Sequence, residues 1–170
     1  MLRNSDPKQA IGAAEWQKMA TCLQQEPMIL GYRNTAEHLA DLHRQELTSV
    51  ITDADEVIAF VAFWPTDCAD FLESGSIWVK PELRGHGLGH QVFANLMLRQ
   101  PTGKSVFSIT KNPIVVHLML GDGWQEATAE TWEKHIPWEI TCGPCDIEGD
   151  RKSCPFKGQR DLCGLYYKLG

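Results

Sequence analysis

The pattern of hydrophobic and polar positions predicts that the chain begins with two helices. Residues 6–25 carry apolar side chains at loose helical spacing, and Asp6 followed by Pro7 suits the start of a helix. A second helix is predicted to start at Asn34, because Glu37 three residues later completes a capping-box pattern. This arrangement leaves little room for a strand ahead of the first helix.

Strand-like patterns follow the two helices. Thr48–Asp53 and Val57–Trp64 favour β structure, and the polar turn between them predicts a hairpin. The run Val57–Trp64 is apolar almost throughout, so we expect both of its faces to be covered. A further strand is predicted over Val106–Thr110.

The stretch from Ser74 to Arg99 predicts a strand, a glycine-rich turn and a helix. Ser76–Val79 is a short β-favouring run, and Pro81 ends it because proline lacks a backbone N–H for the sheet. The turn then carries glycine at every second position, and the helix follows with apolar side chains at Leu88, Val92, Phe93, Leu96 and Met97. Glycine-lined N–H groups at a helix start, beside Arg84, form a site for an anion such as a pyrophosphate.

Two other interpretations fit this turn less well. A glycine-rich turn that packs closely against a neighbour explains the glycines, but it explains neither Arg84 nor the spacing to Pro81. A dinucleotide-binding turn is disfavoured, because the sequence lacks the G-x-G-x-x-G pattern and a repeated βαβ unit.

The segment after the strand predicted at Val106–Thr110 favours a buried helix. Ile114–Leu120 is rich in β-branched residues, so local propensity alone allows a strand. Asn112 followed by proline is typical of a helix start, and the glycines before Trp124 are typical of a helix end.

These two motifs together resemble the GNAT family of N-acetyltransferases. VKPELRGHGLG is similar to the family's acetyl-CoA-binding signature, and NPIVVHLMLGDGW is similar to its N-x-x-A-x-x-L-Y-x-x-x-G-F pattern. The resemblance covers residues 47–124 best. It implies an α/β fold of the α+β type, with a mostly antiparallel central sheet flanked by helices and a splay between the fourth and fifth strands. It also implies a last strand over Leu165–Leu169.

The resemblance also implies a site for acetyl-CoA as cosubstrate. The pantetheine arm would lie against the backbone of the strand, and the pyrophosphate would lie on the turn, with one histidine at the rim and two residues on the far side. These predicted cofactor-binding residues are Ile77, Trp78 and Val79, then Arg84, Gly85, His86, Gly87, Leu88 and Gly89, then His90, and finally Asn112 with His117. The reaction implied is direct transfer of an acetyl group to a primary amine.

The chemistry departs from the family pattern at one position. The family's frequent tyrosine, which can protonate the departing thiolate, falls at Met119. Another group or water would then do this work, and His117 is a candidate. Glu73 is the candidate general base, although a surface glutamate with no catalytic role fits the sequence equally well. A CoA-binding module without catalytic activity, which binds partners through a zinc-stabilised segment, stays open as the alternative function.

The C-terminal third contains a cysteine-rich segment, about residues 142–163, inserted before the last strand. Its spacing, C-x2-C-x8-C-x8-C, predicts a structural zinc site with ligands Cys142, Cys145, Cys154 and Cys163. Reduced thiols in a mobile loop, or a redox-active CGPC pair, are the other interpretations. His38 and His43 do not share a helical face well and are interpreted as exposed or partly buried polar residues, not ligands.

Composition and charge narrow the class of protein. The 170 residues suit a single domain, 43% of them are hydrophobic and 22% charged, and the net charge is −6. This acidic balance argues against generic nucleic-acid binding, including that of a zinc-dependent binder. The absence of a long apolar run predicts a cytoplasmic protein with no membrane partner. The acceptor would be a small molecule, peptide or protein that carries an amine, and the sequence leaves the oligomeric state open.

Overall fold

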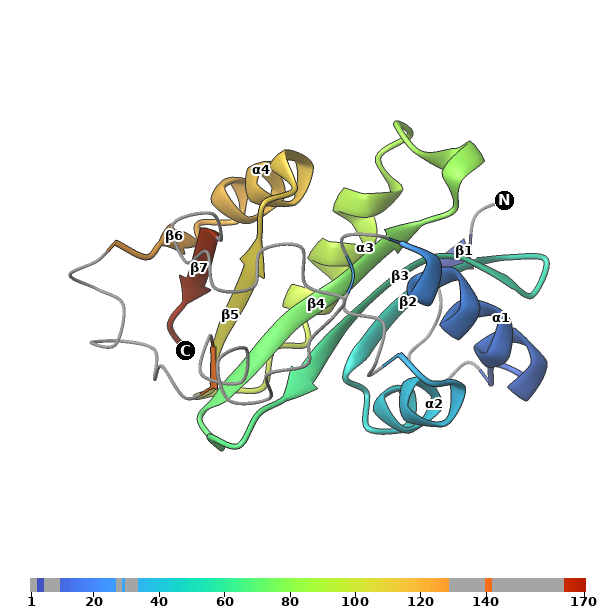
Figure 1. Cartoon of the computed structure of the whole chain (residues 1–170), viewed down its shortest axis with the longest axis horizontal. Coiled ribbons are helices and arrows are strands. Elements are labelled where there is room, and N and C mark those ends of the chain that lie inside the picture. Colours follow the sequence, from blue (N-terminus) through green and yellow to red (C-terminus); the bar gives the residue numbers. More distant parts are fainter. Residues whose placement is uncertain (1–2, 5–9, 27–28, 30–33, 129–139, 142–163) are drawn as a thin grey trace. The chain divides into compact units, whose positions relative to one another are not determined.

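A computed structural model describes residues 3–4, 10–26, 29, 34–128, 140–141 and 164–170 (Figure 1). The helices are α1 (Ala13–Gln25), α2 (Ala36–Arg44), the 3-10 turn η2 (Pro81–Leu83), α3 (Leu88–Met97) and α4 (Pro113–Gly121). The strands are β1 (Arg3–Asn4), β2 (Thr48–Asp53), β3 (Glu56–Pro65), β4 (Phe71–Val79), β5 (Ser105–Thr110), β6 (Gln125–Glu126) and β7 (Gly164–Lys168). Among the helices described, none is both long and apolar enough to cross a membrane.

The chain divides into two compact units. Unit 1 comprises Met1–Trp64 and Gly75–Gln100, and unit 2 comprises Pro65–Ser74 and Pro101–Gly170. Strand β4 contributes its first four residues to unit 2 and the rest to unit 1.

The sheet of unit 1 is ordered β1-β2-β3-β4. Strands β2 and β3 form an antiparallel hairpin in which Thr48 lies opposite Ala62 and Asp53 lies opposite Glu56. Its two turn residues, Ala54 and Asp55, both have positive φ values, of 46° and 70°. Turns with positive φ at both central residues match the right-handed twist of the strands, which explains why so short a loop closes this hairpin.

The core of unit 1 lies between this sheet and the pair α1 and α2. It includes Trp16, Leu23 and Leu39 from the helices and Phe60, Ala62, Trp64 and Trp78 from the strands. Because side chains alternate along a strand, the other residues of β3 face the opposite side of the sheet, where α3 packs on β2 and lies behind the strands in Figure 1. Eight consecutive residues of β3 are buried, which confirms the prediction that both its faces are covered.

Unit 2 has the strand order β4-β5-β7-β6. The start of β4 pairs in parallel with β5, whereas β5 with β7 and β7 with β6 are antiparallel. Phe107, Leu165 and Tyr167 form its buried cluster, and Phe71 and Ile109 pack against them. The predicted face shared by Phe107 and Ile109 is therefore confirmed.

Most predicted elements occur close to their expected bounds. The β2–β3 hairpin, β5, β7, α3 and α4 are all present. The expectation that α4 is a buried helix was wrong, because Ile114 and Leu120 are 70% and 48% exposed and only Val115 and Met119 are buried. The start of α4 is confirmed in detail, because the Asn112 side chain accepts a hydrogen bond from the Ile114 N–H at 3.0 Å. The mixed α/β fold with a mostly antiparallel sheet flanked by helices is confirmed as well, while the splay between the fourth and fifth strands stays a prediction.

Two expectations about the N-terminal part were wrong. Helix α1 begins at Ala13 and not near Asp6, because Gly12 takes an extended conformation and acts as the N-cap. Asp6 and Pro7 lie outside the described residues. A first strand does exist, since Arg3 and Asn4 pair with Thr52 and Ile51 of β2. Two residues suffice for this pairing, so a short N-terminal segment has room for it.

The predicted cap of α2 was wrong by one residue. Thr35 caps the helix, and its hydroxyl accepts a hydrogen bond from the His38 N–H at 3.3 Å. Asn34 is instead completely buried. His43 was expected to be exposed or partly buried but is only 8% exposed, and its ring Nδ1 lies 2.7 Å from the Thr48 hydroxyl oxygen. That hydrogen bond offsets the cost of removing the ring from water.

Strand β4 starts earlier than its sequence pattern predicts. It runs from Phe71, so Glu73 lies within the strand and not ahead of it. The polar residues Glu73 and Ser74 did not indicate a strand by propensity. Pairing of Phe71, Leu72 and Glu73 with β5 extends β4 to Phe71.

Candidate active site

The turn between β4 and α3 is built from two left-handed glycines. Gly85 and Gly87 have φ values of 83° and 81°, a region that other L-residues occupy only at a cost. Ahead of them, η2 follows Lys80, whose N–H donates to the Ile58 carbonyl at 2.9 Å. The sequence prediction that this segment turns sharply from a strand into a helix is therefore confirmed.

The start of α3 has backbone donors that the helix itself does not satisfy. Gly87 is the N-cap and has no side chain with which to satisfy the first N–H groups of the helix. The first intrahelical bond runs from the Gln91 N–H to the Gly87 carbonyl at 3.0 Å. The N–H groups of Leu88, Gly89 and His90 thus have no partner within the helix, and together with the helix dipole they favour an anion.

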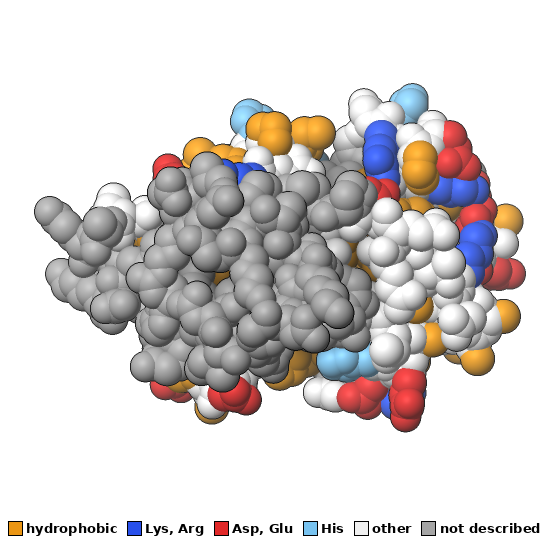
Figure 2. Space-filling view, in the orientation of Figure 1, with side chains coloured by type: hydrophobic (Ala, Val, Ile, Leu, Met, Phe, Trp, Pro, Cys, Tyr) orange, Lys and Arg blue, Asp and Glu red, His pale blue; other side chains and the backbone are white. Residues whose placement is uncertain are grey.

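The side chain of Arg84 lies folded against the protein. Its Nε donates to the Val79 carbonyl at 3.0 Å, and its Nη2 forms an ion pair with the Glu26 carboxylate. The guanidinium thus links three segments: the turn, the end of β4 and the residue that caps α1. Basic and acidic side chains lie next to one another on this part of the surface (Figure 2).

The other residues predicted to bind the cofactor divide by burial. Trp78 and Leu88 are 6% and 4% exposed, so only their backbone atoms can reach a ligand. His86 and His90 are exposed, and His86 Nδ1 lies 3.0 Å from the Arg84 carbonyl oxygen. Gly89 stands on the helix with space for a methyl group, because an added Cβ would lie 3.7 Å from Val79 Cγ2.

A network of ion pairs includes Lys80, the residue immediately before η2. Glu56 binds Lys18 of α1 and also Lys80, whose ammonium lies 2.8 Å from the carboxylate. The hydrogen bond from Lys18, and then that from Lys80, hold the pKa of Glu56 below its ordinary value. The pKa of Lys80 is raised, chiefly by Glu56 and then by Glu82. These contacts fix the position of Lys80 immediately before η2.

Strand β4 contains a strained residue that the sequence did not predict. Ser76 has a φ of 57° in the middle of the strand, and its hydroxyl donates to Oδ1 of the buried Asn34 at 3.1 Å. Asn34, Ser76 and Glu26 are the residues near the predicted site that sequence reasoning missed. Each acts through a partner more than 40 residues away, so local spacing carried no signal for it.

Unit 2 holds the remaining candidates. Glu73 is half-buried in β4, opposite Phe107 of β5. Asn112 caps α4, where His117 is exposed and Met119 is only 1% exposed. The structure therefore brings Ile77–Val79 and the turn together in unit 1, while Glu73, Asn112 and His117 lie in unit 2.

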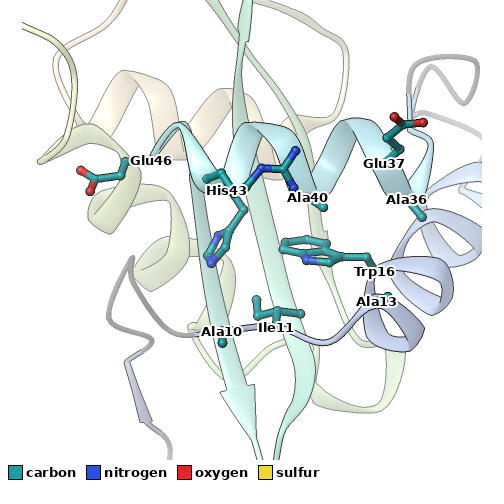
Figure 3. A pocket seen from close by; sticks show the side chains of 10 residues that line it. Ala10, Ile11, Ala13, Trp16, Ala36, Glu37, Ala40, His43 and Glu46 are labelled. Carbon is teal, nitrogen blue, oxygen red and sulfur yellow. The ribbon is translucent and has the colours of Figure 1, made fainter.

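A pocket of about 750 Å³ lies beneath α2 in unit 1. Trp16, His43 and Ile11 project into the space below the helix, whereas Glu37 and Glu46 point away from it (Figure 3). Glu26, the C-cap of α1, lies ten positions after Trp16, which corresponds to about 15 Å at the helical rise of 1.5 Å per residue. The pocket is therefore distinct from the glycine turn between β4 and α3.

All four cysteines of the predicted metal site lie outside the described residues. Within the described part of the chain, no group of three or more His, Cys, Asp or Glu side chains could hold a metal ion. Cys22 and Cys68, which the structure does describe, are free and partly buried.

Comparison with known proteins identifies the family. The sequence profile of the acetyltransferase (GNAT) family matches residues 11–105. This match includes the β4–turn–α3 unit and more than half of the chain. The protein belongs to the acetyltransferase (GNAT) family. Among curated proteins, none matches this sequence.

Solved structures show the same fold at low sequence identity. A Mycobacterium tuberculosis protein in complex with CoA has a TM-score of 0.62 and 15% identity, covering 100% of this chain and 99% of its own. A ribosomal-protein-alanine N-acetyltransferase from Brucella melitensis has a TM-score of 0.63 and 13% identity, covering 100% and 99%.

An N-acetylglutamate synthase from Neisseria gonorrhoeae, complexed with CoA and N-acetyl-glutamate, has a TM-score of 0.63 and 14% identity. The alignment covers 99% of this chain but only 34% of the synthase, so this chain spans about a third of that protein. These likenesses support the fold.

Proposed function

We propose that the protein is an N-acetyltransferase that transfers an acetyl group from acetyl-CoA to a primary amine. The observation that carries the proposal is the turn at Gly85 and Gly87, which opens α3 at a glycine N-cap and so leaves the first N–H groups of the helix without a side-chain cap. Three such donors at a helix start suit a pyrophosphate, and the turn occurs within the part of the chain that the family profile matches. CoA-bound structures of the same fold support the same cosubstrate.

The proposed mechanism is a direct transfer. The backbone at Ile77–Val79 would hold the pantetheine arm, and the turn Arg84–Gly89, with His90 at its rim, would hold the pyrophosphate. A base, for which Glu73 is the candidate, removes a proton from the substrate ammonium. The amine nitrogen then attacks the thioester carbonyl carbon and the C–S bond breaks. The nitrogen gives up its second proton to leave a neutral amide, and the thiolate takes up one proton, so that one proton is released overall.

Met119 cannot supply that last proton. Its thioether has no acidic hydrogen, and the residue is buried at 1% exposure. The thiolate of CoA would therefore leave unprotonated or take a proton from water or from His117.

The acceptor is proposed only as a primary amine. The structural neighbours include a ribosomal-protein-alanine N-acetyltransferase and an N-acetylglutamate synthase complexed with N-acetyl-glutamate. Free amino acids and protein N-termini are therefore both classes of acceptor to test. Calorimetry with acetyl-CoA tests the cosubstrate, and release of free thiol across a panel of amines tests transfer. Absence of acetyl-CoA binding would refute the proposal.

A CoA-binding module without activity is the second candidate. The observation that favours it is the buried Met119 in place of a proton donor. Tight acetyl-CoA binding without thiol release on any amine would support it over the enzyme. The zinc-stabilised segment of this second candidate is inferred from the sequence alone. The cytoplasmic location is also inferred from the sequence alone.

Metal analysis of chelator-washed protein tests the zinc site. We expect about one zinc per chain, lost on replacing Cys142 or Cys163 by serine and kept on replacing Cys22. A folded wild-type protein with clearly less than one zinc per chain would remove the claim.

A further inference from the structure

Ser76 occupies a conformation that strands disfavour. Its φ of 57° places it in the left-handed region, where a residue with a Cβ pays a conformational cost. Such strain persists only where the surrounding structure fixes it, and it gathers at sites of function. The residue also lies within β4, directly before Ile77.

Asn34, which precedes the N-cap of α2, holds this residue by a hydrogen bond. Its side chain is 0% exposed, and Oδ1 accepts the Ser76 hydroxyl hydrogen at 3.1 Å. The backbone carbonyl of Asn34 accepts a second hydrogen bond, from Gln24 Nε2 of α1 at 3.0 Å. A buried amide in a fixed position is a rigid anchor, because shifting it would leave polar atoms without partners away from water.

The strand is anchored again two residues later. Trp78 is 6% exposed and belongs to the hydrophobic core that α1 and α2 form with the sheet. The peptide groups around Ile77 are thus held between a hydrogen-bonded serine and a buried indole. A left-handed residue within a strand also turns the following peptide group out of the regular ladder, as β-bulges do.

We propose that Asn34 is a positioning residue that holds Ser76 in the left-handed conformation and so directs the backbone at Ile77–Val79 toward an acyl-thioester ligand. This inference rests on the proposed function, because that backbone is where the pantetheine arm of acetyl-CoA would bind. Asn34 acts through Ser76 and does not itself touch the ligand.

Glycine at position 76 provides the decisive test. Glycine adopts positive φ without strain, so Ser76→Gly removes the need for an anchor. We expect Asn34→Ala to weaken acetyl-CoA binding about tenfold, which corresponds to about 1.4 kcal/mol. We expect Ser76→Gly alone to bind nearly as the wild type does, and the double variant to recover most of the loss.

Two further variants keep the test decisive. Ser76→Ala removes the hydroxyl but keeps the strain, so it should weaken binding as Asn34→Ala does, even if Asn34→Ala fails to fold. Thr35→Ala removes the adjacent cap of α2 and is the matched control, which should lower stability and leave the affinity for acetyl-CoA unchanged.

The outcomes separate the two proposals. If the wild type does not bind acetyl-CoA in calorimetry, the proposed function fails, and this inference fails with it. If the wild type binds but Ser76→Ala has no effect, or the double variant keeps the full loss of Asn34→Ala, the proposed function stands and the positioning role of Asn34 is refuted.

Discussion

The guanidinium of Arg84 forms an ion pair with the carboxylate of Glu26 and also donates to the Val79 carbonyl oxygen. Arg84 and Glu26 are 58 positions apart in the chain. The arginine therefore fastens the glycine turn to β4 and to the end of α1, in addition to placing positive charge beside it. A planar guanidinium can do both because its donors point in fixed, different directions.

Lysine at position 84 separates these two roles. Arg84→Ala should weaken acetyl-CoA binding about tenfold. Arg84→Lys keeps the charge but loses the two-directional contact, so we expect it to recover less than half of the lost binding free energy in calorimetry. Glu26→Gln keeps a neutral acceptor for the guanidinium and should bind at least as well as the wild type. Full affinity in Arg84→Lys would show that charge alone matters.

Alanine at Gly87 should be costly where alanine at Gly89 is not. Nothing lies within 4 Å of a Cβ added at Gly87, so the cost there is conformational, about 1–2 kcal/mol for a left-handed residue. Gly89 lies in regular helix, where alanine stabilises by about 0.5–1 kcal/mol. Urea unfolding of the two variants measures the difference. Equal effects on stability would contradict the left-handed turn.

The ion pairs of Glu56 predict a dependence of stability on pH. Because the folded pKa of Glu56 lies below its ordinary value of 4.5, its contribution is present above that pH and is lost as the pH falls through the folded pKa. The raised pKa of Lys80 acts oppositely, since its contribution is present below 10.5 and is lost as the pH rises beyond it.

Unfolding free energies of the wild type and Glu56→Gln check this dependence. The wild type should be the more stable at neutral pH, and the difference should shrink toward zero below about pH 4.5. A difference that persists in acid would mean that Glu56 stabilises the fold by some means other than its charge.

Position 119 offers a matched test of the missing proton donor. Met119→Tyr and Met119→Phe add rings of nearly equal size to a buried site, so both should lose about 1–3 kcal/mol of stability from overpacking. Only tyrosine adds a hydroxyl. If protonation of the thiolate limits turnover, kcat of the tyrosine variant should exceed that of the phenylalanine variant by about tenfold or more. Equal kcat values would show that the thiolate leaves without an acid at this position.

Local signals in the sequence predicted the local parts of the fold. Asn112 followed by proline specifies a helix start through one side chain and its neighbours, and the structure confirms it. The turn residues between β2 and β3 likewise act over a few positions. The spacing of Asn34 to Glu37 predicted Asn34 as the cap of α2, but Thr35 caps the helix, and the buried Asn34 side chain instead accepts a hydrogen bond from Ser76 of β4.

Long-range partners account for what the sequence did not predict. Serine at position 76 has no tendency toward positive φ, and its anchor Asn34 lies 42 residues away. By its sequence context Glu73 resembles a loop residue, and its place in β4 depends on the pairing with β5. The glycine spacing predicted the turn between β4 and α3, but the side-chain contacts that hold the turn depend on how α1 packs against the sheet.

The buried strand β3 also bears on how this chain behaves before it is folded. Val57–Trp64 is eight residues long, carries no charge and no proline, and is rich in β-favouring side chains. Such a segment pairs readily with copies of itself when it is exposed, as in aggregates. Glu56 before it and Pro65 after it act as gatekeepers that limit this pairing. We therefore expect the yield of refolding to fall with protein concentration, and to fall further when either flanking residue is replaced by valine.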